Sequence, residues 1–345
     1  MAERFLRLDR EERAEILEGT ASKLGRLPVL LEKDVWVCWT LARLFTLPDQ
    51  PPMAFKGGTS LSKIYSAISR FSEDLDVTLD CRALVPAFDP FSPGVSKSAV
   101  KKHRERLEAA MADHVRGVIA PTLLAAAKEE FPGACEVVMK EGDHERIWLH
   151  YESALPPSHG VIARNIQIEF GGVNCLEPSE PQDVTPYLAA VASALLFPTA
   201  RVQALRPERT FWEKATLIHV ECNRADLRPS KEKLARHWYD VARLADHDIG
   251  RRALADRSLL ESVVQYKQAF YNSSYANYAA CLDGRLRLIP AFEMQQHLRR
   301  DLREMIVNGM FEGTPPDFDE VLSRLQALEL AINETAAAYR GSPLT

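Results

Sequence analysis

The alternation of apolar and polar residues predicts helices in the first part of the chain. Residues 9–25 form a polar segment that starts at a capping residue, Asp9, and ends near Gly25, as a surface helix does. Residues 30–46 carry apolar side chains on one helical stripe, which predicts a second helix with a buried face. Residues 98–130 are also expected to be helical.

Strands are predicted where short apolar or alternating runs lie between turn residues. These runs occupy residues 53–55, 74–79, 135–139, 146–152 and 165–170. We expect Trp36 and Trp39 of the second helix to cover the resulting sheet. Residues 173–205 are predicted to be loop-rich, with one short helix around 186–196.

The last part of the chain has a helical pattern. Pro207 suits the first position of a helix, and helical runs follow at residues 207–221 and 234–248. We therefore predict an α+β fold: a small mixed sheet with flanking helices in residues 1–205, joined to a helical C-terminal domain in residues 206–345.

Composition narrows the class of protein. A net charge of −5 gives no global nucleic-acid signature, so any such contact must come from a local patch. The six cysteines are scattered without a C-x-x-C pair, which favours reduced thiols in a cytoplasmic protein over disulfides or a zinc site. The charged start lacks the apolar segment of a signal peptide, and no apolar run is long enough to span a membrane. The P-loop pattern of ordinary NTPases does not occur either.

The most informative stretch begins with a glycine turn. Gly57 and Gly58 permit a sharp bend and a close approach of a ligand to the backbone. Thr59 and Ser60 follow as expected hydroxyl caps of a helix whose free N–H groups suit phosphate, and Lys56 adds a cation. The alternative is an ordinary turn.

Two acids follow about fifteen residues later on a predicted strand. Alternate residues of a strand share a face, so Asp74 and Asp76 point the same way. Neighbouring carboxylates repel one another unless a cation lies between them, and Mg²⁺ prefers carboxylates together with substrate phosphate oxygens. The alternative is a solvated strand face. Turn and acids together favour a metal-assisted nucleotide site.

These motifs resemble a known family. The segments KGGTS and RFSEDLD, with RTFWEKATLIH and RHWYDVARL further on, are similar to the motifs of the AbiEii/AbiGii toxins. That family comprises nucleotidyltransferases of the DNA polymerase β-like superfamily, which act in type IV toxin–antitoxin systems. The resemblance implies a polymerase β-like sheet and extends over nearly the whole chain.

The resemblance also implies roles for individual residues. Asp74 and Asp76 would be catalytic and would bind metal. Lys214 and Asp240 would be further catalytic residues, without a role as metal ligands. A lysine on a helix can hold a triphosphate as a point charge. The alternative for Asp240 is an ion pair within its own helix. Arg209 is a further phosphate candidate.

A third carboxylate in the polymerase β-like fold comes from a strand beside the two acids. Glu169, at the end of an apolar strand, is the candidate for this metal ligand. The alternative is an acid on an edge strand that faces water.

The implied reaction is attack of an acceptor hydroxyl on the α-phosphorus of an NTP, with loss of pyrophosphate and with Mg²⁺ or Mn²⁺ as cofactor. The implied acceptor is the 3′ end of tRNA, and a separately encoded antitoxin protein is the expected partner, with no membrane association. Two alternatives stay open: the same chemistry on a protein or small molecule, and a non-catalytic NTP-binding regulator. The intact pair of acids argues against the regulator.

Overall fold

The computed structural model describes residues 3–72, 74–86, 88–141, 143, 145–156, 163–172, 175–224 and 233–341. The chain divides into two compact units. Unit 1 consists of Met1–Tyr65, Phe71–Phe88 and Lys102–Leu205; unit 2 consists of Ser66–Arg70, Asp89–Lys101 and Arg206–Thr345. Residues 224–235, whose polar and basic composition predicts a link between two helices, lie mostly outside the described residues.

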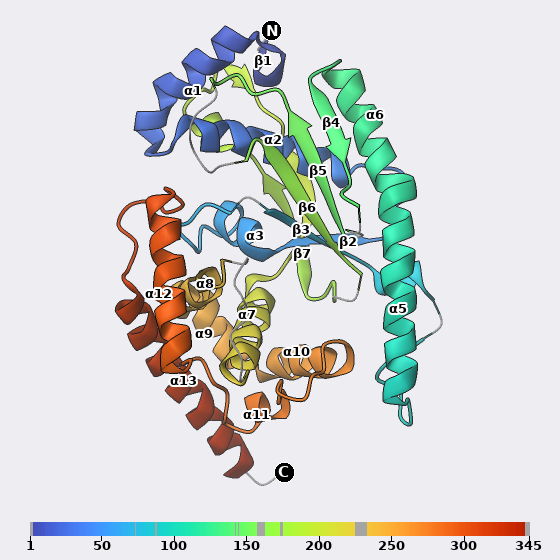
Figure 1. Cartoon of the computed structure of the whole chain (residues 1–345), viewed down its shortest axis with the longest axis vertical. Coiled ribbons are helices and arrows are strands. Elements are labelled where there is room, and N and C mark those ends of the chain that lie inside the picture. Colours follow the sequence, from blue (N-terminus) through green and yellow to red (C-terminus); the bar gives the residue numbers. More distant parts are fainter. Residues whose placement is uncertain are drawn as a thin grey trace. The chain divides into compact units, whose positions relative to one another are not determined.

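A seven-stranded mixed sheet forms the centre of unit 1 (Figure 1). Its spatial order is β4-β5-β6-β3-β2-β9-β7, with β3–β6 and β2–β9 parallel and the other neighbours antiparallel. The strands are β2 (Met53–Lys56), β3 (Asp74–Leu79), β4 (Cys135–Val138), β5 (Arg146–Tyr151), β6 (Asn165–Gly171), β7 (Ser179–Val184) and β9 (Ala200–Leu205). The predicted α+β class with a mixed sheet is thus confirmed.

The prediction that residues 173–205 are loop-rich is wrong. This segment supplies β7 and β9, which extend the sheet beyond β2. The strand β7 is polar and contains Pro181, which suits its place at the edge of the sheet, where proline is tolerated. The short helix expected around 186–196 is reduced to the 3₁₀ turn η3 (Tyr187–Ala190), followed by β8 (Leu195–Leu196), which pairs with β1 (Glu3–Arg4).

Helices α1 (Arg10–Leu24) and α2 (Pro28–Leu44) form where the sequence predicts them. Asp9 and Glu12 make a reciprocal capping box at the start of α1, and Gly25 ends it with a φ of 61°. Both tryptophans of α2 are buried with the apolar strand residues, as predicted, and Trp36 stacks on Tyr151 of β5. The helix therefore packs on the sheet through aromatic contacts.

A long helical segment runs beside β4 (Figure 1). Its apolar stripe belongs to the same core. It consists of α5 (Lys97–His114), the π-helical turn η2 (Val115–Ile119) and α6 (Ala120–Glu130). Its buried residues recur every fourth position: Met111, Val115, Ile119, Leu123 and Ala127. Because an α-helix has 3.6 residues per turn, such a stripe drifts by about 40° per step, and the wider π turn reduces this drift.

Unit 2 is built mainly from helices. They are α7 (Pro207–Cys222), α8 (Ala235–Ala245), α9 (Asp248–Ala255), α10 (Arg257–Phe270), α11 (Ala279–Leu282), α12 (Phe292–Val307) and α13 (Phe318–Gly341). Pro207 begins α7, as predicted. The buried indoles of Trp212 and Trp238 donate hydrogen bonds to the carbonyls of Ala253 and Leu288, so the helical core leaves these polar groups satisfied.

The remaining small elements all belong to unit 1: the 3₁₀ turn η1 (Phe5–Arg7) and the short helices α3 (Gly57–Lys63) and α4 (Cys81–Leu84). Within the described part of the chain, no helix has both the length and the apolar character that a membrane span requires.

Candidate functional site

The glycine turn and the acidic strand are in direct contact. Gly57 begins α3 immediately after β2 and has a φ of +79°, a conformation that glycine adopts without strain. A Cβ atom at this position would lie 1.8 Å from Oδ2 of Asp76. Gly57 is therefore required twice, once by its backbone and once by the carboxylate that occupies the space beside its Cα.

The hydroxyls after the glycines do not cap the helix, so that part of the prediction is wrong. Lys56 is the N-cap of α3, and no side chain caps this end. Thr59 donates to the carbonyl of Asp74 at 2.5 Å, and Ser60 donates to the carbonyl of Gly57 at 3.0 Å. Both side chains are buried, and the Thr59 bond fastens α3 to the start of the acidic strand.

The strand β3 alternates as predicted. Leu75 and Val77 are fully buried in the core, whereas Asp74 and Asp76 are half-buried. A strand that sends every second side chain into an apolar core must send the intervening ones to its other face. The two carboxylates therefore share the face that meets the glycine turn.

Four charged residues lie side by side across the sheet. In the register of the strands, Asp76 pairs with Lys56 of β2 on one side and with Glu169 of β6 on the other, and Glu169 pairs in turn with Arg146 of β5. Neighbouring strands lie about 4.8 Å apart, and residues in register project to the same face. We call these four residues the charged row.

The charged row places Glu169 beside Asp76, on an interior strand between β3 and β5. The alternative that Glu169 is an acid on an edge strand is therefore wrong. Glu169 already has a partner: Nε of Arg146 donates to its Oε2 at 2.9 Å. No pattern in the sequence predicted that Arg146 would pair with Glu169, because Arg146 is one of many charged residues that lie next to a turn.

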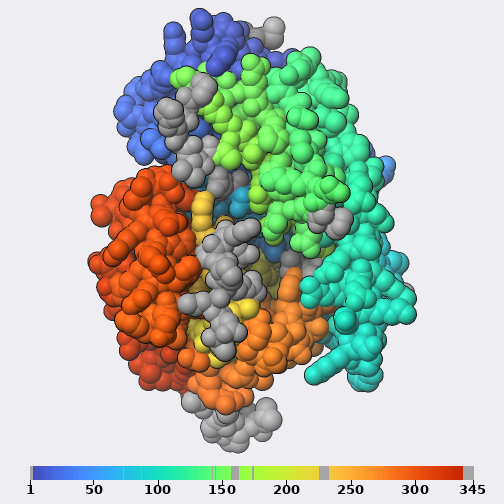
Figure 2. Space-filling model, in the orientation of Figure 1, coloured from blue at the N-terminus to red at the C-terminus, as the bar shows by residue number. Residues whose placement is uncertain are grey.

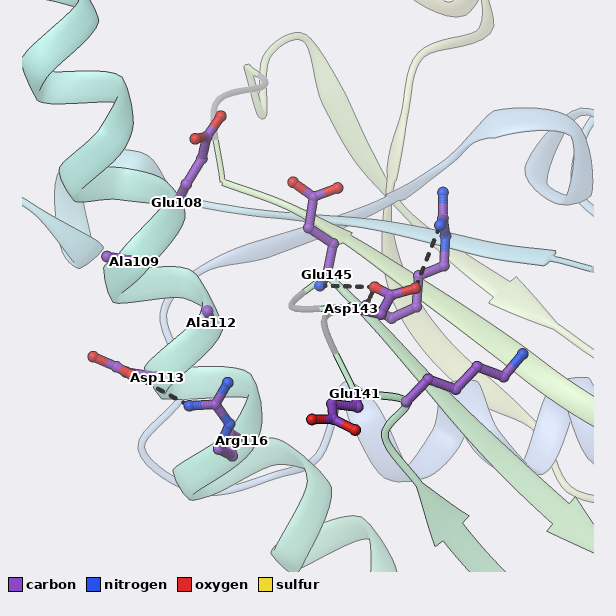
Figure 3. A pocket seen from close by; sticks show the side chains of 10 residues that line it. Glu108, Ala109, Ala112, Asp113, Arg116, Glu141, Asp143 and Glu145 are labelled. Carbon is purple, nitrogen blue, oxygen red and sulfur yellow. Dashed lines mark hydrogen bonds and ion pairs between the residues drawn. The ribbon is translucent and has the colours of Figure 1, made fainter. Parts of the chain in front are cut away.

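A groove of about 800 Å³ adjoins the charged row at Arg146. It lies between α5 and the segment that joins β4 to β5, and acidic residues line it on both sides (Figure 3). The space-filling view shows α5 and the β4–β5 hairpin at the surface of unit 1 (Figure 2). Burial, followed by the charges of Glu169 and Glu108, raises the pKa of Glu145 in this groove.

The donor set of unit 1 fits a hard divalent cation in its chemistry. Asp74 and Asp76 share a face, and Glu169 is next to Asp76 in register. Carboxylate oxygens are the ligands that Mg²⁺ and Mn²⁺ prefer. Among the described residues, however, no three such side chains converge on one point, and Glu169 is turned to Arg146.

A buried ion pair supports the helix of the glycine turn. Nζ of Lys63, at the end of α3, contacts Oδ1 of Asp34, and both side chains are almost fully buried. The other oxygen of Asp34 accepts the N–H of Tyr187 at 2.7 Å. Burial opposes the charge on Lys63, but Asp34 outweighs it and raises the lysine pKa. The pair therefore stays charged and fixes α3 against α2.

In unit 2, Asp240 is the centre of a buried cluster. Arg70 donates to both of its oxygens, at 2.7 and 2.8 Å, and Nζ of Lys214 lies 3.0 Å from Oδ2. Asp240 and Arg70 are 0% and 2% exposed, so water screens this cluster little. Burial opposes ionisation of Asp240, but the two cations outweigh it and lower its pKa. The alternative of an ion pair within helix α8 is wrong, because both partners come from other segments.

Lys214 and His237 share the same buried surroundings. Burial, partly offset by Asp240, lowers the pKa of Lys214. Burial and the nearby cations hold the pKa of His237 well below its usual value, so this imidazole is neutral. Its Nδ1 lies 3.5 Å from Nζ of Lys214. The sequence motif RFSEDLD contains Arg70, but nothing in the sequence links it to Asp240.

Arg209 is 2% exposed and donates to Glu213 at 3.2 Å and to Ser262 at 3.4 Å. Its guanidinium thus joins α7 to α10, and any contact with a phosphate would have to displace these partners.

The predicted site residues therefore fall into two groups. Unit 1 brings together Lys56, Gly57, Gly58, Thr59, Ser60, Asp74, Asp76 and Glu169. Unit 2 holds Lys214, Asp240 and Arg209, of which the first two are in contact.

Unit 1 thus combines a mixed sheet with a glycine turn on which the carboxylate of Asp76 packs, as expected from the motifs that resemble those of nucleotidyltransferases. The family comparison agrees: residues 39–324 match the profile described as nucleotidyl transferase AbiEii toxin, type IV toxin–antitoxin system. Because this match spans most of the sequence, the chain belongs to the AbiEii nucleotidyltransferase toxin family.

Two solved structures are similar to this chain. JHP933 from Helicobacter pylori is 14% identical, with 91% of this chain and 95% of that chain covered and a TM-score of 0.43. The nucleotidyltransferase toxin MenT4 from Mycobacterium tuberculosis is 17% identical, with 96% and 99% covered and a TM-score of 0.38. A search of curated proteins found no match.

Proposed function

We propose that this chain is a metal-dependent nucleotidyltransferase toxin that transfers a nucleotide from an NTP to the 3′ end of tRNA and so blocks translation. One observation carries the proposal: the carboxylate of Asp76 packs directly on Gly57. A carboxylate held against a glycine turn brings a cation site next to a backbone that can approach phosphate closely.

Asp74 and Asp76 would hold the divalent cation, and Glu169 would join them once it leaves Arg146. When bound, such a cation neutralises phosphate charge and lowers the pKa of an acceptor hydroxyl. The backbone of Gly57 and Gly58 would lie along the β- and γ-phosphates.

The other side chains of unit 1 would position the substrate. Lys56 lies next to Asp76 and would balance the charge of the triphosphate. Thr59 and Ser60 would act through the backbone, because their buried hydroxyls hold α3 in place. Catalysis of this kind depends on positioning and electrostatics rather than on covalent chemistry by the protein.

In the reaction, an oxygen of the acceptor forms a bond to the α-phosphorus, and the bond from that phosphorus to the β-phosphate bridge breaks. Pyrophosphate leaves, and the hydroxyl proton is released. Lys214 would place a positive charge near the triphosphate. Asp240 would orient the ammonium of Lys214 through their 3.0 Å ion pair.

The metal assignment is tested with Asp74→Asn and Asp76→Asn. Each change keeps the size of the side chain and removes its charge, so folding should persist while Mn²⁺ binding and nucleotide transfer are lost. Asp183→Asn is the matched control, because it removes an exposed carboxylate from an edge strand of the same sheet and should leave both unchanged. Full transfer by either acidic-strand variant would refute the assignment.

The acceptor is tested by incubating the protein with Mg²⁺, each α-labelled NTP in turn, and either total tRNA or total protein. We expect label at the 3′ end of tRNA, which is then resistant to aminoacylation. Label in protein alone would assign the same chemistry to a different acceptor, and absence of label with every NTP would favour a non-catalytic regulator.

A further inference from the structure

Arg146 holds an unusual position for a cation. It ends the charged row beside Glu169, the carboxylate that the proposed function assigns to the cation site. Its Nε donates to Glu169 at 2.9 Å, and 40% of its side chain is exposed, so the pair is accessible to solvent. A bound guanidinium and a divalent cation would compete for the same carboxylate.

A second carboxylate lies within reach of the same guanidinium. Asp143, in the turn before β5, is 3.4 Å from Nη1 of Arg146. Asp143 is itself fixed, because its other oxygen accepts the N–H groups of Glu145 at 3.2 Å and Arg146 at 3.1 Å. Because Arg146 already donates to Asp143, it stays ion-paired when it leaves Glu169.

We infer that Arg146 is a positioning residue that occupies Glu169 until a divalent cation displaces it, whereupon the guanidinium keeps only its bond to Asp143. The inference rests on the proposed function, since it takes the cation to bind at Asp76 and Glu169. It also accounts for the absence of three converging ligands among the described residues, because the third carboxylate is held by an internal cation.

The groove beside the row favours this movement. It is lined by five acidic and three basic side chains, Arg146 being one of the three. Its acids come from the helix on one side and from the turn on the other (Figure 3). A guanidinium that leaves Glu169 thus enters surroundings with an excess of negative charge, where its own charge remains favourable.

The test is the affinity of the full chain for Mn²⁺, measured from the paramagnetic resonance signal of the free ion, with and without a non-hydrolysable NTP analogue. Arg146→Gln removes the competitor and should tighten binding roughly two- to fivefold, the range that a partly exposed ion pair represents. Arg201→Gln is the matched control: this arginine makes a cross-strand pair with Asp183 at 3.0 Å in the same sheet and should leave the affinity unchanged.

A second pair of variants separates competition for Glu169 from a general effect of charge. In a Glu169→Gln background, Arg146→Gln should cause no further tightening, because the contested carboxylate is gone. Equal tightening in both backgrounds would overturn the inference, as would an unchanged affinity in Arg146→Gln.

Failure of the proposed function gives a different result. If Asp76→Asn binds Mn²⁺ as tightly as the wild type, the cation site itself is wrong and the inference falls with it. If Asp76→Asn loses binding while Arg146→Gln behaves like the wild type, the cation site stands and only the role of Arg146 is refuted.

Discussion

Replacing Gly57 with alanine tests the contact between the glycine turn and the acidic strand. The new methyl group would meet Oδ2 of Asp76 at 1.8 Å and Cγ at 2.7 Å, both far inside contact distance. The backbone would also be strained, because Gly57 has a φ of +79°. Two separate penalties therefore apply to one substitution.

The first penalty is a backbone strain, and the second is a steric clash with a neighbouring side chain. Holding a residue with a Cβ in the left-handed region costs about 1–2 kcal/mol. Forcing an extra carbon into a packed site costs about another 1–3 kcal/mol, because the Asp76 carboxylate must move. Adding the two ranges, we expect Gly57→Ala to lower the free energy of unfolding by about 2–5 kcal/mol and to abolish nucleotide transfer.

The chain offers a matched control for the backbone term. Gly133 also has a φ of +79°, but no heavy atom lies within 4 Å of its added Cβ. Gly133→Ala should therefore lower the free energy of unfolding by about 1–2 kcal/mol, the cost of the left-handed backbone alone, and should leave nucleotide transfer intact. The difference between the two variants isolates the contact with Asp76.

Denaturant unfolding of both variants gives the two free energies, provided that the denaturant dependence of each is unchanged. In an Asp76→Ala background the added cost of Gly57→Ala should fall toward that of Gly133→Ala, since the Asp76 Oδ2 and Cγ atoms are removed and only Cβ remains, at 3.0 Å. Equal costs at Gly57 and Gly133 in the wild-type background, with transfer retained, would refute the reasoning.

The buried cluster of unit 2 gives two further predictions. Asp240→Asn leaves the ammonium of Lys214 buried without its anion, so the free energy of unfolding should fall by about 3–5 kcal/mol. Asp319→Asn, which breaks an exposed pair, should cost far less, and equal costs in denaturant titrations would contradict the buried assignment. Because the pKa of His237 is lowered in the folded protein, only the unfolded chain takes up a proton at this residue as the pH drops below ~6.5. The free energy of unfolding should therefore decrease as the pH is lowered further, by up to about 1.4 kcal/mol per pH unit. His237→Gln should make this limb less steep between about pH 7 and 5, while the lowered pKa values of His103, His114 and His219 account for the rest of it. An unchanged slope would show that His237 does not contribute.

Much of the local structure follows from the sequence alone. The Asp9 cap, the Gly25 end and the Pro207 start each place a helix boundary, because these residues act on the backbone next to them. The alternation in β3 likewise places Asp74 and Asp76 on one face, since the side-chain period of a strand is two whatever lies beside it.

Other features depend on which segments meet, and no local pattern contains that information. The strand β9 lies in a segment whose composition predicts a loop, yet it pairs with β2 beside the glycine turn. The hydroxyls of Thr59 and Ser60 have the sequence position of helix caps, yet nearby carbonyls accept their hydrogen bonds instead. For β9 and for Thr59 the tertiary arrangement supplied the partner that overrides the local preference, whereas Ser60 bonds to a carbonyl three residues earlier in its own helix.

The sequence thus determined the types of residue at the site, and the tertiary structure determined their neighbours. Only the strand register puts Glu169 between Asp76 and Arg146, and only the packing of unit 2 puts Arg70 on Asp240. The physical reason is that propensity and periodicity act over a few residues. Ion pairs and packing act over a few ångströms whatever the sequence separation, as between Arg70 and Asp240, which are 170 positions apart.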